Sequence, residues 1–449
     1  MGIMAEGADK PGVDDGNGRP ARARHPRRAG IGRVLARPGG GSPWELLSGR
    51  VFRALWVAAL ASSMGSWIEG VAVMWKMAEL TDSPLLVALV QTAGSLAIVT
   101  LAVPGGAISD LWPRRTILAV TQGWAVVTAL ALALTAAFGL LDPVVIIVLT
   151  FSLGLATTLG WPAWQVTLPE VALPTQMPAA VALNSAQWNI AQLLAPALTG
   201  VVLAVAGSSA ALGLSALGFA GFFGAALLWR PARVRPRGGL VHVHVAGRVA
   251  LRYARRSGAL RALLVRTALF ALPASTMLAL LPLVARRLLH EGSSGYGLLL
   301  SLIGAGALLG VTLLPRLEPL GSKALLWTGM LLLAVTLVVV GLARSRWVVW
   351  PDLFVAGTVW LVVPTTLVVA VQRVTPPRIR SRGLGMYLAV YQGAFAIGST
   401  TAGLVADRVG VPLTFFAAAL ALVLAALVAA RTPLPGVEGA VGSSVVGMD

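Results

Sequence analysis

The chain has 449 residues, of which 57% are hydrophobic and 12% charged, and its mean hydropathy is +0.82. A soluble protein of this length does not have so apolar a composition, so we predict an all-α polytopic membrane protein. The net charge of +18 would suit nucleic-acid binding, but the basic residues gather between apolar stretches without interleaved stacking aromatics, so we expect no nucleic-acid partner.

Residues 1–48 hold the Gly, Pro, Arg and Asp typical of a disordered tail and no apolar core of a signal peptide. We expect this basic tail to touch anionic lipid headgroups. Twelve apolar segments follow, each near the ~20 residues that cross about 30 Å of hydrocarbon. They cover residues 51–79, 84–109, 115–139, 143–167, 178–205, 210–229, 262–288, 296–314, 322–343, 347–372, 383–406 and 411–430.

The connections between these segments differ in their content of Lys and Arg. Of the 35 Lys and Arg, 29 fall in the tails and in the loops on the tails' side, and 6 fall on the other side. Because basic loops stay in the cytoplasm, we predict a multi-pass protein of a prokaryotic inner (plasma) membrane with both termini cytoplasmic.

The longest cytoplasmic connection, residues 231–261, is basic and separates two sets of six segments. We therefore predict an N-terminal six-helix half over residues 49–230, a C-terminal half over 262–432 and a cytoplasmic tail over 433–449. This layout is typical of secondary transporters, which bind their substrate between the halves near the bilayer midplane.

The first segment contains an intramembrane carboxylate, Glu69, which the topology places just beyond the midplane on the side away from the cytoplasm. Burial disfavours the ionised carboxylate, so a proton can bind and leave as access alternates. We predict that Glu69 is the proton-coupling group. An alternative is that it pairs permanently with a polar neighbour such as Lys76, although Lys76 lies ~10 Å further along the helix and we expect it to snorkel outward.

A loop motif lies between the second and third segments. Residues 106–115, GAISDLWPRR, resemble the G-x-x-x-D-x-x-x-R-R signature of the major facilitator superfamily, with departures at Leu111 and Pro113. The glycine lets helices approach, the aspartate can face a helix N-terminus, and the arginines hold the loop at the headgroups. The residues that we predict to form a cytoplasmic gate are Gly106, Asp110, Arg114 and Arg115.

The fifth segment contains a second match. Residues 184–200, NSAQWNIAQLLAPALTG, are similar to the Gly-Pro element of superfamily exporters, in which Pro196 bends the helix and Gly200 allows close packing. An ordinary Pro-kinked helix is the alternative. With residues 296–310 and 398–410, the chain resembles the siderophore-exporter and macrolide-efflux branch, which implies export of small amphipathic molecules by proton antiport.

Polar and aromatic residues recur at mid-membrane depth on segments that, by this resemblance, border the central cavity. We predict that they line a site for a flat or hydrophobic substrate, and interhelical hydrogen bonding stays open as the alternative for the polar ones. They are Trp67, Asn184, Trp188, Asn189, Trp360, Tyr391 and Gln392.

Other functions have no support in the sequence. The chain has no cysteine, no G-x-x-x-x-G-K-[ST] phosphate loop and no hydrolase or metalloprotease motif, and His242 and His244 have no acidic neighbours. We expect a monomer that is not an enzyme and has no cofactor or metal. The alternatives to an exporter are an importer or facilitator on the same fold, with Glu69 binding substrate directly, and a non-transporting scaffold.

Overall fold

The structure, a computed structural model, describes residues 43–101, 112–230, 252–253, 256–342, 344–376 and 379–431. This part of the chain is helical and contains no strand. Its α-helices are α1 (Pro43–Ser48), α2 (Arg50–Leu80), α3 (Pro84–Leu101), α5 (Arg114–Ala137), α6 (Pro143–Val171), α7 (Met177–Leu228), α9 (Gly258–Leu283), α10 (Ser293–Leu317), α11 (Ser322–Leu342), α12 (Arg346–Val374), α13 (Arg380–Val409) and α14 (Val411–Arg431). Short turns of other helix types are η2 (Pro174–Gln176), η3 (Val284–Leu288) and η4 (Glu318–Leu320).

Eleven of the helices in the described residues are long and apolar enough to cross a membrane. The longest, α7, has 52 residues and breaks at Gly207, where φ is 78°. Glycine adopts this left-handed conformation without the steric cost of a Cβ atom. The break divides α7 into two limbs, and the twelve predicted segments are thereby confirmed.

Local signals in the sequence fix several helix ends. At the start of α6, Asp142 Oδ1 accepts the backbone N–H of Val145 at 2.9 Å, and Pro143 occupies the first turn, where no N–H is needed. Ser257 caps α9 in the same way through the N–H of Leu260 at 3.3 Å. Gly410, with φ of 86°, ends α13 immediately before α14.

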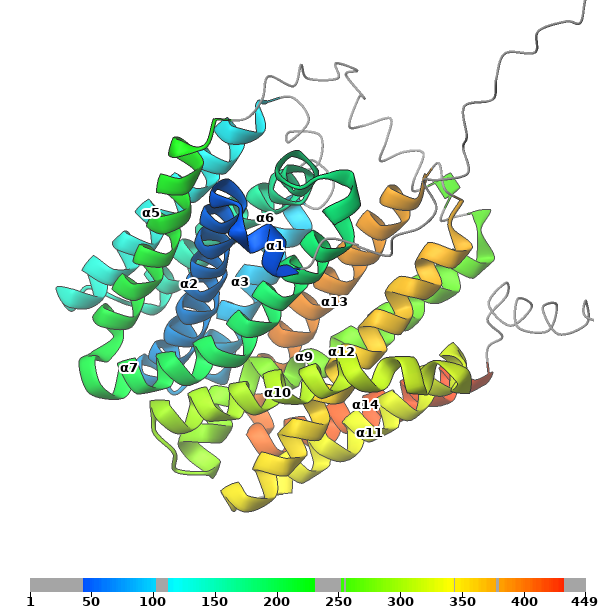
Figure 1. The fold of residues 1–449 in the computed structure, drawn as a ribbon. Coiled ribbons are helices and arrows are strands. Elements are labelled where there is room, and N and C mark those ends of the chain that lie inside the picture. The colour runs from blue at the N-terminus through cyan, green and yellow to red at the C-terminus, as the bar shows by residue number, and fades with distance from the viewer. Residues whose placement is uncertain are drawn as a thin grey trace, which may run out of the picture. The chain divides into compact units, whose positions relative to one another are not determined.

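The helices pack into two groups. In the first, α7 packs on α2 and α5, and α6 packs on α3 and α5. In the second, α10 packs on α12, α9 on α13, and α11 on α12 and α14. The main contacts between the groups are α3 with α13 and α7 with α10, which lie side by side in Figure 1. The predicted arrangement of two six-helix halves is therefore confirmed.

The contact between α7 and α10 depends on glycine. A Cβ atom on Gly200 would lie 3.0 Å from the Cα of Ser294 and 3.2 Å from the Cα of Gly297, and one on Gly297 would collide with the carbonyl of Pro196. Small residues allow membrane helices to approach this closely. The first limb of α7 and the start of α10 therefore meet backbone to backbone.

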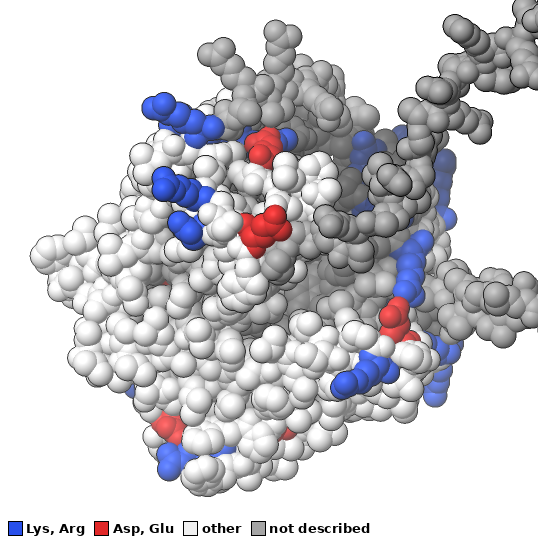
Figure 2. All heavy atoms as spheres, in the orientation of Figure 1, with Lys and Arg blue, Asp and Glu red and all other residues white. Residues whose placement is uncertain are grey.

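We distinguish the two ends of the bundle by charge. The basic end, where α2 begins, carries among others Arg50, Arg53, Arg114, Arg115, Arg261, Arg373 and Arg431. The far end is where α2 ends and α3 begins. On the face drawn in Figure 2, charged residues form groups in the upper part, at the right and at the lower left, and an uncharged surface lies between these groups. Such a surface suits contact with lipid.

The two groups are joined at the far end. Ser83 donates to the Asp407 carboxylate at 3.2 Å, and the rings of Trp75 and Tyr296 stack with centroids 5.7 Å apart. In the middle of the bundle, Thr92 lies 2.8 Å from the hydroxyl of Ser399.

The π-helical turn η3 adds two arginines to this closure. Arg287 Nη2 donates to Asp82 Oδ1 at 3.1 Å, and Arg286 donates to the carbonyl of Ala78. These contacts, together with the hydrogen bond from Ser293 to Gly200, lie between the middle of the bundle and the far end. The structure therefore has its far end closed.

We expect Gly297→Ala to destabilise the protein by about 1–3 kcal/mol, because the added methyl group overpacks the contact with α7. The measurement is the thermal unfolding temperature in detergent. Gly224→Ala on α7 is the matched control, since a Cβ there meets nothing within 4 Å. An equal effect of the two substitutions would contradict the close contact.

Candidate functional site

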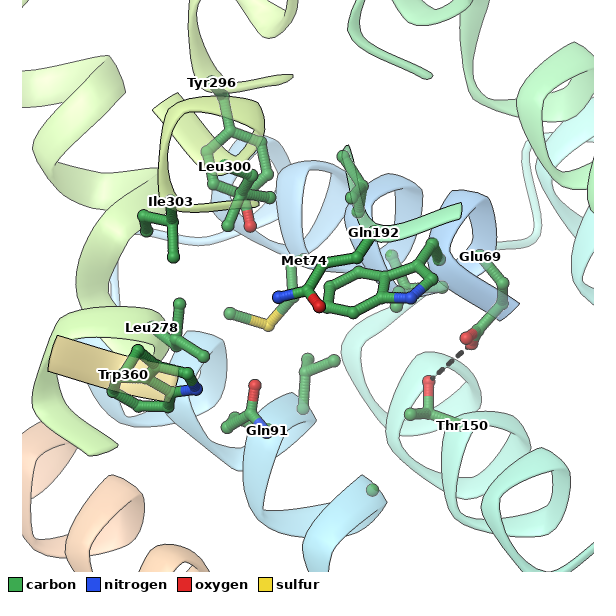
Figure 3. Close-up of a pocket in the computed structure, with 16 residues that line it drawn as sticks. Glu69, Met74, Gln91, Thr150, Gln192, Leu278, Tyr296, Leu300, Ile303 and Trp360 are labelled. Atoms are coloured by element: carbon green, nitrogen blue, oxygen red, sulfur yellow. Dashed lines mark hydrogen bonds between the residues drawn. The ribbon is translucent and has the colours of Figure 1, made fainter. Parts of the chain in front are cut away.

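A cavity of about 220 Å³ lies between the two helix groups. Both groups contribute to its wall, and Figure 3 shows the side chains of α2, α3, α6, α7, α9, α10 and α12 around it. The lining residues are Trp67, Glu69, Gly70, Val71, Val73, Met74, Val90, Gln91, Gly94, Thr150, Gln192, Leu278, Tyr296, Leu300, Ile303 and Trp360. The wall is therefore mainly apolar and aromatic, with one acidic group.

Glu69 is buried, with 6% of its surface exposed, and it lies on the cavity wall. Its Oε1 accepts a hydrogen bond from Thr150 Oγ1 at 3.4 Å, and in Figure 3 the carboxylate points towards this hydroxyl on α6. The described lining includes no Lys or Arg. A buried carboxylate with one long, neutral hydrogen bond has little to stabilise its negative charge.

Lys76 has a different partner. Its Nζ lies 3.2 Å from Glu79 Oε2, and Trp75 Nε1 donates to Glu79 Oε1 at 2.6 Å. The permanent Glu69–Lys76 pair, which the sequence left open, is not formed. Glu69 therefore has no cationic partner among the described residues around it.

Two of the predicted cavity residues, Trp67 and Trp360, line the cavity from opposite groups. The indole Nε1 of Trp67 is buried and has no hydrogen-bond partner among the described residues. Trp360 packs edge-on against Phe395, with ring centroids 5.7 Å apart. The cavity thus has an indole on each side, and one of them retains an unused donor.

The other predicted cavity residues lie outside this lining. Asn184 accepts from Trp164 Nε1 at 2.8 Å, and Asn189 donates to the backbone carbonyl of Ser185 at 2.9 Å. The Asn184 bond joins α7 to α6 and the Asn189 bond stays within α7, and a role of either amide in substrate binding remains a prediction.

The aromatic members of that set pack against other rings. Trp188 contacts Trp67, with ring centroids 6.1 Å apart. Tyr391 stacks on Phe395 at 6.0 Å, and its neighbour Gln392 is not among the lining residues. A role for them in substrate binding remains a prediction.

Four polar lining residues, Gln91, Thr150, Gln192 and Tyr296, were not among the predicted site residues. Gln192 belongs to the polar series of the fifth segment, and its spacing from Trp188 was the signal that could have identified it. Gln91 is a single amide in an apolar segment, and Tyr296 follows a loop glycine, so neither has a pattern that marks a cavity. In Figure 3 the amides of Gln91 and Gln192 lie on the cavity side of their helices.

The predicted gate motif is described only in part, because Gly106 and Asp110 lie outside the described residues. Arg114 forms an ion pair with Glu170 at the end of α6. Arg115 Nε donates to the carbonyl of Ala226 at 3.3 Å, at the end of α7. The two arginines thus tie the start of α5 to its neighbours at the basic end.

Pro196 and Gly200, the predicted exporter element, lie on the first limb of α7. Both are buried in the contact with α10, and Ser293 Oγ donates to the carbonyl of Gly200 at 3.2 Å. This element therefore joins the two helix groups, between the cavity and the far end.

Comparison with known proteins identifies the family. A family model described as "Transmembrane secretion effector", MFS_3, matches residues 41–446. The chain belongs to this family of major facilitator transporters. It is a membrane transporter and not an enzyme, as the sequence predicted.

Two relatives give this major facilitator transporter a context. It is 25% identical to the multidrug efflux pump Tap of Mycolicibacterium fortuitum over 389 residues, which cover 84% of this chain and 94% of Tap. It is 28% identical to the staphyloferrin A transporter of Staphylococcus aureus over 143 residues, but that match spans only 32% of this chain and 36% of the relative.

Solved structures support the fold. A mutant of the nucleoside transporter NupG superposes with a TM-score of 0.71 at 13% identity, covering 84% of this chain and 98% of NupG. The D-xylose-proton symporter superposes with a TM-score of 0.68 at 14% identity, covering 87% and 99% of the two chains. At such identities the likeness establishes the major facilitator fold alone.

We expect a hydrophobic carbodiimide, which modifies protonated carboxyl groups in apolar surroundings, to label Glu69. Intact mass spectrometry should show an adduct that disappears in Glu69→Gln. Glu79→Gln is the control and should leave the adduct unchanged, because Glu79 is partly exposed and paired with Lys76. An equal extent of labelling in the wild type and in Glu69→Gln would contradict the protonated, apolar state of Glu69.

Proposed function

We propose that this transporter exports small amphipathic organic molecules of the drug, antibiotic or siderophore class by proton antiport and alternating access. The observation on which the proposal rests is Glu69, the one carboxylate in the described cavity lining, where no basic residue accompanies it. Intramembrane acids in transporters commonly mark ion or substrate pathways.

The coupling follows from competition for one carboxylate. Protonated Glu69 is neutral and needs no counter-ion, so it suits the apolar cavity, and the Thr150 hydroxyl remains its neighbour. A cationic or polar substrate group is favoured only when the proton has left. We assume that substrate and proton cannot occupy Glu69 together. The transporter then opens to one side with substrate bound and returns to the other side with a proton bound, so substrate and proton move in opposite directions.

The cavity wall supports an amphipathic organic substrate. Apolar and aromatic side chains offer a surface for hydrocarbon and rings, while the amides of Gln91 and Gln192 offer hydrogen bonds. A small inorganic ion would make few favourable contacts with such an apolar and aromatic wall. The similarity to the multidrug efflux pump Tap favours export over import.

The closed far end supports alternating access. We infer from the distribution of Lys and Arg that the basic end faces the cytoplasm of a prokaryotic cell, with both termini on that side. The described structure then corresponds to a state closed to the outside. Export requires the far-end contacts between the groups to break while the cavity is loaded.

We expect Glu69→Gln to abolish proton-driven transport. In inside-out vesicles with an imposed pH gradient, uptake of ethidium should fall to the level of vesicles without the transporter. The reason is that the amide of the substituted glutamine binds no proton at physiological pH. Glu79→Gln, which removes a carboxylate on the same helix, should retain uptake. Full proton-driven uptake by Glu69→Gln would disprove the coupling role, and uptake only in right-side-out vesicles would favour an importer.

We expect a disulfide across the far end to lock the transporter. The natural chain has no cysteine, so Ser83→Cys with Asp407→Cys supplies a unique pair at the position of a 3.2 Å hydrogen bond. Oxidation should stop transport and reduction should restore it. Each single variant, treated with the same oxidant, is the control, and an oxidised double variant with unimpaired transport would contradict alternating closure at this end.

A further inference from the structure

Three indoles form a continuous row on the first helix group. Trp67 on α2 contacts Trp188 on α7 with centroids 6.1 Å apart, and Trp188 contacts Trp161 on α6 at 5.5 Å with the rings at 71°. We call these three residues the indole row. It begins at the cavity, because Trp67 lines the cavity wall beside Glu69.

The row extends from the cavity towards the basic end. Trp161 precedes the end of α6, and Trp188 follows the start of α7, by roughly 15 Å of helix at ~1.5 Å per residue. Their depth is too great for an interfacial aromatic belt. Even so, 46% of Trp161 and 39% of Trp188 are exposed.

The contact between Trp161 and Trp188 joins α6 to the start of α7. The two helices also meet through the hydrogen bond from Trp164 Nε1 to Asn184 at 2.8 Å. Trp188 is the ring that connects this contact to Trp67 and so to the cavity. Both rings keep part of their surface exposed outside these contacts.

A second aromatic row, on the other group, differs in this respect. It runs from Trp360 through Phe395 and Tyr391 to Tyr387. Phe395 and Tyr387 are buried, and the Tyr387 hydroxyl donates to the carbonyl of Pro364 at 3.3 Å. Phe395, Tyr391 and Tyr387 stack on one another outside the cavity lining, so Trp360 is the ring of this row that lines the cavity.

The chemistry of the indole row favours one class of ligand. Indole faces stack on planar rings and attract cations. Glu69 adds negative charge next to Trp67, and the described cavity lining contains no Lys or Arg to oppose a cation.

We propose that the indole row binds planar aromatic cations on their way between the basic end and Glu69, and that Trp188 determines this specificity. The inference rests on the proposed function and narrows its substrate class. Trp188 is the middle ring of the row, so its loss separates Trp161 from the cavity. A cation without rings cannot stack on the row and should therefore depend less on Trp188 than a planar aromatic cation does.

The test compares two cations in the inside-out vesicle assay, ethidium as the planar aromatic one and tetrabutylammonium as the one without rings. Trp188→Leu should raise the half-saturating ethidium concentration by about tenfold, the scale of a lost stacking and cation–π contact. Trp188→Phe, which keeps a ring, should have a smaller effect. Tetrabutylammonium transport should change clearly less than ethidium transport in both variants, since a cation without rings has a cation–π contact to lose but no stacking contact.

Trp327→Leu is the matched control. Trp327 is 38% exposed, close to the value for Trp188, but it lies on α11, away from the cavity lining. Gel filtration of each variant verifies folding. Equal losses for both cations, or no change for ethidium in Trp188→Leu, would overturn the inference while leaving proton-driven export intact. Failure of the wild type to move either cation against a pH gradient would instead overturn the proposed function and this inference with it.

Discussion

Glu69 lies in the apolar interior with one hydroxyl group as its hydrogen-bond partner, at 3.4 Å. The free-energy cost of an uncompensated charge in such a place is large, so the surroundings must supply a proton, a cation or water whenever the group is charged. Without that cost, the cavity would be an ordinary packing defect. With it, the occupancy of the cavity and the charge of Glu69 depend on each other.

The contacts between the two helix groups are of two kinds. The glycine contact of α7 with α10 is made by backbone atoms and depends on shape alone. The far-end contacts, such as Ser83 with Asp407 and Arg287 with Asp82, are exposed polar pairs. Exposed pairs contribute little net stability, so they can exchange protein partners for water at small cost. The contact of α7 with α10 therefore suits a hinge that is kept in every state, and the far-end polar pairs suit a contact that opens during transport.

The sequence predicted the fold almost completely, because membrane depth imposes a segment length and loop charge imposes an orientation. It predicted the burial of Glu69 within the membrane for the same reason, since a carboxylate at that depth stands out in the sequence, while the proton-coupling role of Glu69 remains a prediction. The partner Thr150 could not be predicted, because the contact depends on how α2 and α6 are rotated against each other. Asn184 shows the converse: its polar spacing is as regular as that of Gln192, yet only Gln192 reaches the cavity.

The break at Gly207 has a mechanical consequence. The first limb of α7 meets α10 through Gly200, and the second limb meets α2, where a Cβ on Gly65 would lie 2.8 Å from the carbonyl of Ser215. A tight turn joins these limbs, so neither can slide far without the other. Since Gly65 and Glu69 are one helical turn apart on α2, α7 links its close contact with α10 to the helix that carries the acid.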